Sequence, residues 1–157
     1  MAKVKQIPDG YHSVTPYLIV EGASDAIDWY GKVLGTKERM RMPMSGDRVG
    51  HAELELGDSV IMLADEFPDM GARGPKAIGG SPVSILVYVA DVDAVFDRAV
   101  KAGATAREEP LDKFYGDRSG TFEDPFGQVW NVATHVEDVP PDEMAKRAAE
   151  MMGGSSG

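Results

Sequence analysis

Several features are scarce or absent in this chain of 157 residues. It has no cysteine, which excludes disulfide bonds, thiolate metal sites and a cysteine nucleophile. Its N-terminal stretch carries lysines but no apolar run, because Gln6, Pro8, Asp9 and Gly10 interrupt it, so neither a signal peptide nor a membrane-spanning helix is indicated. We therefore expect a soluble, cytoplasmic protein.

Basic residues are also in short supply. The chain has 26 acidic and 16 basic residues and a net charge of −10, which repels phosphate backbones and anionic lipids. The glycine-rich segment 71–75 lacks the Lys-Ser or Lys-Thr of a phosphate-binding loop, and the chain has no Gly-x-Ser-x-Gly elbow. We therefore expect no nucleic acid partner and no membrane partner.

The chain does contain an internal repeat. Equivalent residues recur at a spacing of 68 to 70 positions, as in the pairs Val20 and Val89, Gly35 and Gly103, and Gly57 and Gly127. The apolar period predicts a strand, a helix and three further strands in each half. In the first half these are 15–20, 23–34, 37–44, 49–56 and 59–64, and in the second 84–89, 92–102, 104–108, 118–123 and 128–134. Two βαβββ repeats predict an α+β fold.

The repeats define the expected organisation. We expect a single domain over 13–135, with repeat one at 13–64 and repeat two at 82–135. Segment 65–80 is rich in glycine, proline and charge, and we interpret it as both a linker and a mobile flap. Prolines and acids at 140–143 favour the start of a helix over 140–152, which we expect to pack on a partner subunit, followed by a flexible tail at 153–157.

Several runs in order carry a family resemblance. They are Pro16-Tyr17-Leu18, Ala26-Ile27-Asp28-Trp29-Tyr30, His51-Ala52-Glu53-Leu54, Tyr115-Gly116-Asp117-Arg118, Asp124-Pro125-Phe126-Gly127 and Trp130-Asn131-Val132-Ala133-Thr134-His135. With two βαβββ halves, the chain resembles the vicinal oxygen chelate superfamily of glyoxalase I, bleomycin-resistance proteins and extradiol dioxygenases, and most closely the PhnB-like group. The resemblance implies curled mixed sheets forming half-barrels around a ligand cavity, in a homodimer that often exchanges halves between chains.

The resemblance also implies where a metal would bind. Members that use a metal hold it with His or Glu on the first and last strand of each half. Counting by register puts these positions at Thr15, Ile61, Ser84 and Asn131, which are poor ligands for a divalent ion. We therefore expect no metal centre at the usual positions and no cofactor.

A second polar cluster leaves a divalent metal open as an alternative. In strand 49–56, Ala52, Leu54 and Leu56 alternate with His51, Glu53 and Glu55, so the polar set should face the concave side. There it would bind a metal, act in acid-base chemistry or line a wet groove. His135 shares a face with Asn131, so the alternative metal set is His51, Glu53 and His135.

The candidate ligand-binding residues are polar, aromatic or methionine side chains expected near the cavity. They are Tyr17, His51, Glu53, Met62, Phe67, Tyr115, Arg118, Asn131 and His135. Arg118 would either bind a carboxylate or phosphate of the ligand or pair with Asp117 or Glu123. The catalytic residues, if any exist, are not indicated.

Three functions follow from these patterns. The first is a small-molecule-binding protein of the glyoxalase/bleomycin-resistance type without the usual metal centre, which sequesters an aromatic or amphiphilic compound. The second is a metal-dependent lyase, isomerase or dioxygenase of the glyoxalase type. The third is a non-catalytic scaffold or regulator whose acidic surface and C-terminal helix meet a protein partner.

Overall fold

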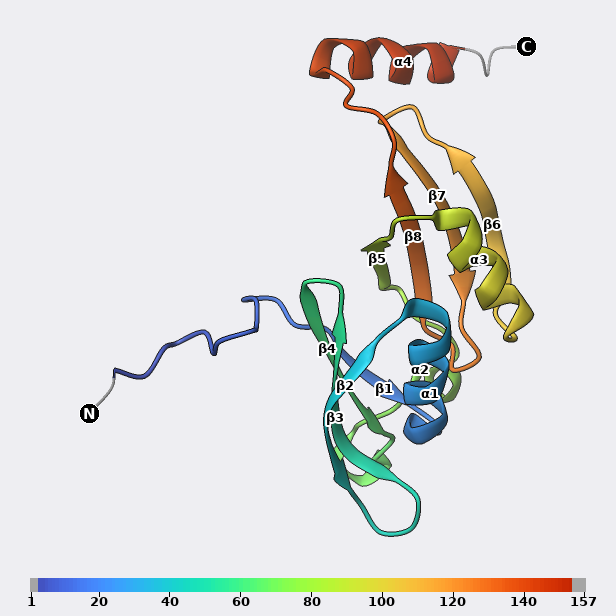
Figure 1. Cartoon of the computed structure of the whole chain (residues 1–157). Coiled ribbons are helices and arrows are strands. Elements are labelled where there is room, and N and C mark those ends of the chain that lie inside the picture. Colours follow the sequence, from blue (N-terminus) through green and yellow to red (C-terminus); the bar gives the residue numbers. More distant parts are fainter. Residues whose placement is uncertain (1–2, 154–157) are drawn as a thin grey trace. The chain divides into compact units, whose positions relative to one another are not determined.

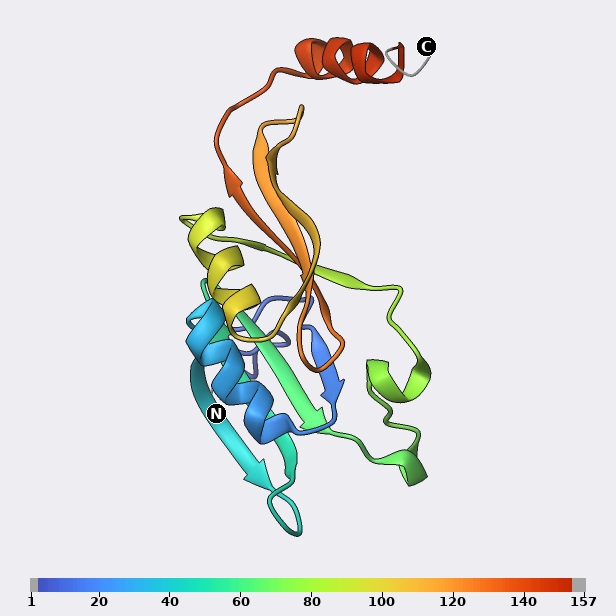
Figure 2. The same cartoon turned by 90° about the vertical axis from the view of Figure 1, so that its right-hand side faces the viewer.

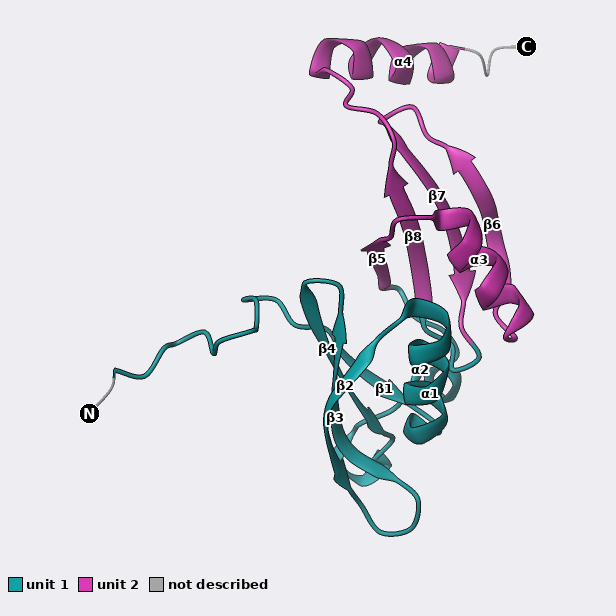
Figure 3. Cartoon of the chain, in the orientation of Figure 1, with its two compact units in different colours: residues 1–82, 125–128 teal, residues 83–124, 129–157 magenta. Residues whose placement is uncertain are grey.

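The computed structural model describes residues 3–153, and the predicted tail beyond Gly153 lies outside the described residues. The chain divides into two compact units (Figure 3). Unit 1 extends to Pro82 and also includes Pro125–Gln128, and unit 2 comprises Val83–Asp124 and the chain from Val129 onward. Each unit contains one copy of the repeat.

Unit 1 has a four-stranded mixed sheet and one long helix (Figure 1). Its elements are β1 (Tyr17–Val20), α1 (Ala23–Leu34), β2 (Lys37–Pro43), β3 (Val49–Leu56), β4 (Ser59–Asp65), the 3-10 turn η1 (Pro68–Met70) and the short helix α2 (Pro75–Ile78). The strand order is β1-β4-β3-β2, in which β1 and β4 are parallel and the other pairs are antiparallel.

Figure 2 shows α1 against one face of this sheet, and the core of unit 1 lies between the two. The helix buries an apolar stripe that includes Tyr30 and Val33, and the strands contribute Leu54, Ile61 and Leu63. All five are at most 2% exposed. The apolar stripe of the helix therefore packs on the face of the sheet to which the alternating apolar residues of the strands point.

A buried carboxylate fixes the start of α1. Asp65, at the end of β4, accepts hydrogen bonds from the backbone N–H groups of Gly22 and Ala23, each at 2.9 Å, and from that of Val49 at 2.7 Å. These groups at the helix N-terminus have no partner within the helix, and a negative charge there is stabilising. One side chain thus joins β3, β4 and α1.

Unit 2 repeats the plan. Its elements are β5 (Ser84–Tyr88), α3 (Val92–Lys101), β6 (Thr105–Asp112), β7 (Asp117–Glu123), β8 (Val129–His135) and α4 (Pro141–Gly153), with strand order β5-β8-β7-β6. Trp130 and Phe122 are fully buried, and the ring of Phe96 on α3 packs edge-on against Phe122 at 6.1 Å. The Asp91 side chain caps α3 by accepting the Ala94 N–H at 3.1 Å.

The predicted α+β fold with two βαβββ repeats is confirmed. Segment 65–80 contains η1 and α2, and a bridge between Phe67 and Ala72 closes the turn that holds η1. Helix α4 begins one residue after its predicted start, and no described residue in it is buried. Among residues 3–153, no helix is long and apolar enough to cross a membrane.

Candidate functional site

The face of the unit 1 sheet that points away from α1, called here the open face, carries the candidate site. Met62 on β4 pairs with Tyr17 on β1 and with Glu53 on β3, so these three side chains share that face. Leu54 and Ile61, which pair with each other, lie on the opposite face. The alternation in strand 49–56 therefore directs His51 and Glu53 as predicted.

Four side chains form a continuous chain of hydrogen bonds on the open face. Tyr17 Oη lies 2.8 Å from His51 Nδ1, and His51 Nε2 lies 3.0 Å from Glu53 Oε2. The other carboxylate oxygen of Glu53 accepts a hydrogen bond from the Tyr11 hydroxyl. Glu53 is 6% exposed whereas Tyr17 is 49% exposed, so the chain runs from a buried carboxylate to an accessible phenol.

The charges and hydrogen bonds of these four side chains determine which of their atoms carry the protons. The hydrogen bond from Tyr11 and, to a smaller extent, the one from His51 lower the pKa of Glu53, which outweighs the effect of burial. Glu53 is therefore ionised at neutral pH and only accepts hydrogen bonds. His51 must then donate from Nε2, and in a neutral imidazole Nδ1 is left to accept the Tyr17 hydroxyl.

Both tyrosines remain protonated. The hydrogen bond to Glu53 raises the pKa of Tyr11, with burial and the charge of Glu53 acting in the same direction. Burial and then the Glu53 charge raise the pKa of Tyr17. Tyr17 is consequently a hydrogen-bond donor in the resting state.

Tyr11 is the member of the site that the sequence did not indicate. It lies in the polar N-terminal stretch, 42 residues before Glu53, and no strand or helix period includes it. Its ring is held under the guanidinium of Arg39, whose Cζ lies 4.8 Å from the ring centroid. The turn made by the Tyr11 N–H and the Pro8 carbonyl, 3.2 Å apart, is the local feature that positions it.

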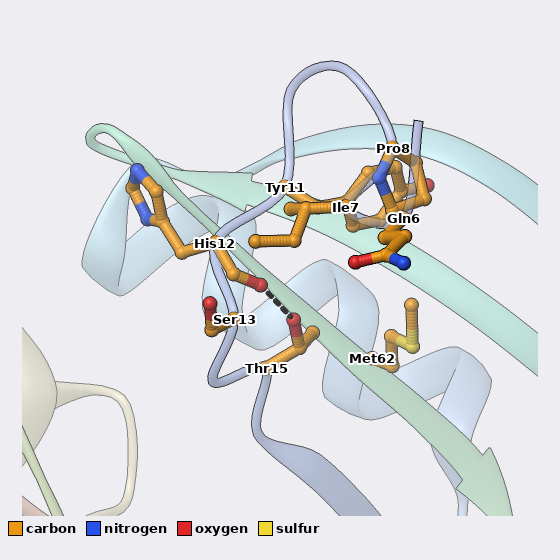
Figure 4. Close-up of a pocket in the computed structure, with 8 residues that line it drawn as sticks. All are labelled: Gln6, Ile7, Pro8, Tyr11, His12, Ser13, Thr15 and Met62. Atoms are coloured by element: carbon orange, nitrogen blue, oxygen red, sulfur yellow. Dashed lines mark hydrogen bonds between the residues drawn. The ribbon is translucent and has the colours of Figure 1, made fainter. Parts of the chain in front are cut away.

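A cavity of about 480 Å³ in unit 1 adjoins this series of hydrogen-bonded side chains (Figure 4). It lies between the N-terminal segment and β4, and its lining is mainly apolar. The lining residues are Gln6, Ile7, Pro8, Tyr11, His12, Ser13, Thr15 and Met62. In Figure 4 the thioether of Met62 points toward the side chains of the 6–11 segment, whereas the His12 ring points away from it. Tyr11 and Met62 connect the cavity to the open face.

The open face of unit 2 holds a different polar cluster. His135 lies between two carboxylates, with Nδ1 at 2.7 Å from Asp117 and Nε2 at 2.7 Å from Asp138. These hydrogen bonds raise the pKa of His135. The Tyr88 hydroxyl donates to the second oxygen of Asp117 at 2.9 Å, which raises the pKa of that phenol. Asn131 bonds Ser84 at 3.0 Å and also Thr121.

Three predicted ligand residues make contacts of their own, and the charge of Tyr115 also acts on Tyr88 of the unit 2 cluster. Arg118 sits on the helix-covered side of β7, where it binds both carboxylate oxygens of Asp93 at 2.9 Å and Asp112 at 3.2 Å. The predicted partners Asp117 and Glu123 were wrong, because they alternate to the other face. Phe67 belongs to the turn that pairs with Ala72, and Tyr115 packs edge-on against Phe114 at 5.3 Å.

Comparison with known proteins settles the family. The model of the Glyoxalase/Bleomycin resistance protein/Dioxygenase superfamily matches residues 10–132. The chain belongs to this superfamily. Uncharacterized proteins of Mycobacterium bovis and of Mycobacterium tuberculosis strain H37Rv are each 39% identical to it over 135 residues, which cover 84% of this chain and 89% and 79% of the relatives.

Solved structures agree with the assignment to the glyoxalase superfamily. TioX from Micromonospora sp. ML1 is 27% identical with a TM-score of 0.62, and the match covers 80% of this chain and 99% of TioX. A gene product from Arabidopsis thaliana is also 27% identical, with a TM-score of 0.63 and coverage of 78% and 98%. A PhnB protein from Bacillus cereus shares the fold at 18% identity, with a TM-score of 0.59 and coverage of 78% and 99%. The expected PhnB-like resemblance is thereby confirmed at the level of fold.

One of the metal positions expected from the superfamily changes with the observed register. Ser84 and Asn131 lie on the open face of unit 2, and Thr15 lines the unit 1 cavity. Ile61 is 2% exposed on the helix-covered face, so that prediction was wrong by one residue and Met62 occupies the open-face position. Among the described residues of either unit, no group of three or more His, Asp or Glu side chains, the group of His135, Asp117 and Asp138 included, is arranged so that it could hold a metal ion.

Proposed function

We propose that this member of the glyoxalase superfamily binds a small aromatic or amphiphilic molecule in the unit 1 cavity. The supporting observation is the mainly apolar cavity of about 480 Å³ next to the Tyr17, His51, Glu53 and Tyr11 chain. Ligand pockets are typically apolar spaces of about 300 to 1,000 Å³ with few polar groups that orient the ligand. Because the cavity is not filled by side chains, it also favours ligand binding over the scaffold hypothesis.

The lining suits a ligand with a flat apolar part. Met62 and Ile7 supply adaptable apolar contact, and the Tyr11 ring, fixed by Arg39 and Glu53, supplies a rigid aromatic wall. Tyr17, which is 49% exposed and follows Thr15 by two residues, offers its hydroxyl as a polar contact for the ligand.

The proposed function does not use the usual metal centre. Both ring nitrogens of His51 are engaged, one by Tyr17 and one by Glu53, so a metal on His51 would have to displace one of them. The open-face positions offer the hydroxyls of Thr15 and Ser84, the amide of Asn131 and the thioether of Met62. These side chains do not fit a divalent ion that needs carboxylates or imidazoles.

A homodimer is a further part of the proposal. The open face of unit 2 exposes large apolar side chains: Leu86, Tyr88 and Leu111 are 51%, 62% and 53% exposed. Exposed apolar patches of this kind mark protein or ligand contacts. Sedimentation equilibrium should give twice the mass of one chain, and a monomer at micromolar concentration would contradict the proposed dimer.

The binding proposal is tested with an aromatic amphiphile, 1-anilinonaphthalene-8-sulfonate. We expect saturable fluorescence enhancement with one site per chain. Met62→Gln should raise the Kd about 10-fold or more, because a buried methionine contributes about 1.5–3 kcal/mol. Met70→Gln is the matched control, since Met70 is 80% exposed and does not line the cavity.

Two results would contradict the binding proposal. One is fluorescence that rises without saturation. The other is equal weakening by the two methionine variants, which would place the dye outside the cavity.

A further inference from the structure

The open face of unit 1 contains the parts of an activated nucleophile. A hydroxyl, an imidazole and a carboxylate stand in line, with Tyr17 Oη 2.8 Å from His51 Nδ1 and His51 Nε2 3.0 Å from Glu53 Oε2. Activation of a nucleophile by a general base uses this order: an acidic hydrogen on the nucleophile, a base within hydrogen-bond reach, and a third group that orients the base. Tyrosine is among the side chains that act as nucleophiles.

We propose that Tyr17, His51 and Glu53 form an acyl-transfer site in which the Tyr17 hydroxyl attacks a carboxylic ester. The ionised Glu53 holds the Nε2 proton of His51, so Nδ1 presents its lone pair to the Tyr17 hydroxyl. Tyr17 touches the reacting atoms and His51 takes the proton. Glu53 is a positioning residue, because it acts only through His51.

The step balances without any additional reactant. Tyr17 Oη forms a bond to the carbonyl carbon of the ester while its proton passes to His51 Nδ1. The bond between that carbon and the leaving oxygen breaks, and an alkoxide leaving group takes the proton back from His51. The products are an acyl ester on Tyr17 and an alcohol. With p-nitrophenyl acetate the leaving group departs as nitrophenolate, and His51 returns its proton to water.

The accessibility of the three side chains agrees with this assignment. Glu53 and His51 are shielded, with side-chain exposures of 7% and 22%, while Tyr17 is 49% exposed and open to a reagent. The apolar cavity that adjoins this face through Met62 would accept the acyl or alcohol part of the ester.

Unit 2 supplies an internal control. Tyr88 is 62% exposed and donates a hydrogen bond to the Asp117 carboxylate, not to an imidazole. Its hydroxyl therefore has a weaker base beside it than Tyr17 has. Reactivity of Tyr17 relative to Tyr88 in the same molecule separates activation by His51 from simple exposure.

The test is acetylation of the whole chain by p-nitrophenyl acetate, followed by peptide mass spectrometry at each tyrosine. We expect Tyr17 to be acetylated about 100-fold faster than Tyr88, the lower end of the range for general-base assistance. His51→Gln should reduce the Tyr17 rate to that of Tyr88, with circular dichroism confirming the fold. Equal rates at Tyr17 and Tyr88 in the wild type, or a Tyr17 rate unchanged by His51→Gln, would overturn the proposal.

The role of Glu53 is tested by measuring which ring nitrogen of His51 carries the proton. Nitrogen-15 NMR of the wild type should show the proton on Nε2, and Glu53→Gln should lose this preference together with at least 10-fold of the Tyr17 rate. Loss of the rate without a change of tautomer would overturn the positioning role.

The inference rests on the proposed binding site only for the place of the ester. Failure of the binding proposal would appear as a Tyr17 rate that rises linearly with ester concentration, without saturation. Failure of the acyl-transfer proposal would appear as absence of faster labelling at Tyr17.

Discussion

Replacing Glu53 with glutamine tests how the buried carboxylate holds the site together. Glu53 is 6% exposed and accepts hydrogen bonds from Tyr11 and His51. Glutamine has nearly the same shape, but one of its two terminal atoms donates hydrogen bonds. Since both neighbours are donors, one of the two contacts is lost or must reverse.

The magnitude follows from these contacts. A hydrogen bond to a charged group contributes about 1.5–3 kcal/mol, and a buried donor left without its acceptor costs about 1–3 kcal/mol. Removing the charge also removes the cost of burying a carboxylate, which offsets part of the loss. We expect Glu53→Gln to lower the free energy of unfolding by about 1–3 kcal/mol at pH 7.

The pH dependence gives the prediction its sign. The pKa of Glu53 in the folded protein lies below its ordinary value of 4.5, chiefly because of the Tyr11 hydrogen bond. Its contribution to stability is therefore present above pH 4.5 and is lost as the pH falls through the lowered folded value. Glu53→Gln should remove this part of the acid dependence.

Urea unfolding of the variant at pH 7 and at a series of pH values from 5 down to 3, followed by circular dichroism, measures both effects. Glu55→Gln is the matched control on the same strand, because Glu55 has a side chain that is 51% exposed and approaches Arg39 only at 3.9 Å. An equal loss in the two variants, or an acid dependence unchanged by Glu53→Gln, would refute the reasoning.

Three further predictions concern unit 2. Gly116 has φ +101°, and a Cβ there would overlap the carbonyl oxygen of Glu137, so Gly116→Ala should lower the free energy of unfolding by about 3 kcal/mol. The control Gly57→Ala, at φ +60° with open space around the Cβ, should lower it by about 1 kcal/mol. Equal urea midpoints of the two variants would contradict this prediction. Because the pKa of His135 is raised in the folded protein, its contribution to stability is full below pH 6.5 and is lost as the pH rises through the folded-state pKa. Thermal unfolding of His135→Gln should not show this loss of stability at higher pH. Arg118→Ala should lower the melting temperature slightly and leave dye binding unchanged, since its partners are two aspartates of unit 2; weaker dye binding would return Arg118 to the ligand site.

The fold could be predicted because its determinants are local. The apolar stripe of α1 and the flanking Gly35 mark that helix at 23–34, and the alternation in 49–56 marks β3 and the direction of His51 and Glu53. The observed bounds of these two elements equal the predicted ones. The apolar period and the turn residues are sufficient to predict an element where the direction of each side chain depends only on its neighbours in the sequence.

The parts that failed depend on contacts between distant residues. The partners of Arg118 are on α3 and at the end of β6, and Tyr11 reaches Glu53 across 42 positions. Ile61 was displaced by one because the count started from Gly57 and Gly127, which are 70 positions apart. The open-face positions Met62 and Asn131 are instead related by the 69-residue spacing that also relates Val20 to Val89.

The most direct test of the account is carbon-13 methyl NMR of the methionines while 1-anilinonaphthalene-8-sulfonate is added. The chain has nine methionines, and Met62→Leu identifies the signal of Met62. Binding in the unit 1 cavity predicts a saturable shift of the Met62 methyl signal, with Met70 and the exposed Met151 unchanged. A dye that binds while the Met62 signal stays in place, or that moves only Met151, would contradict the account.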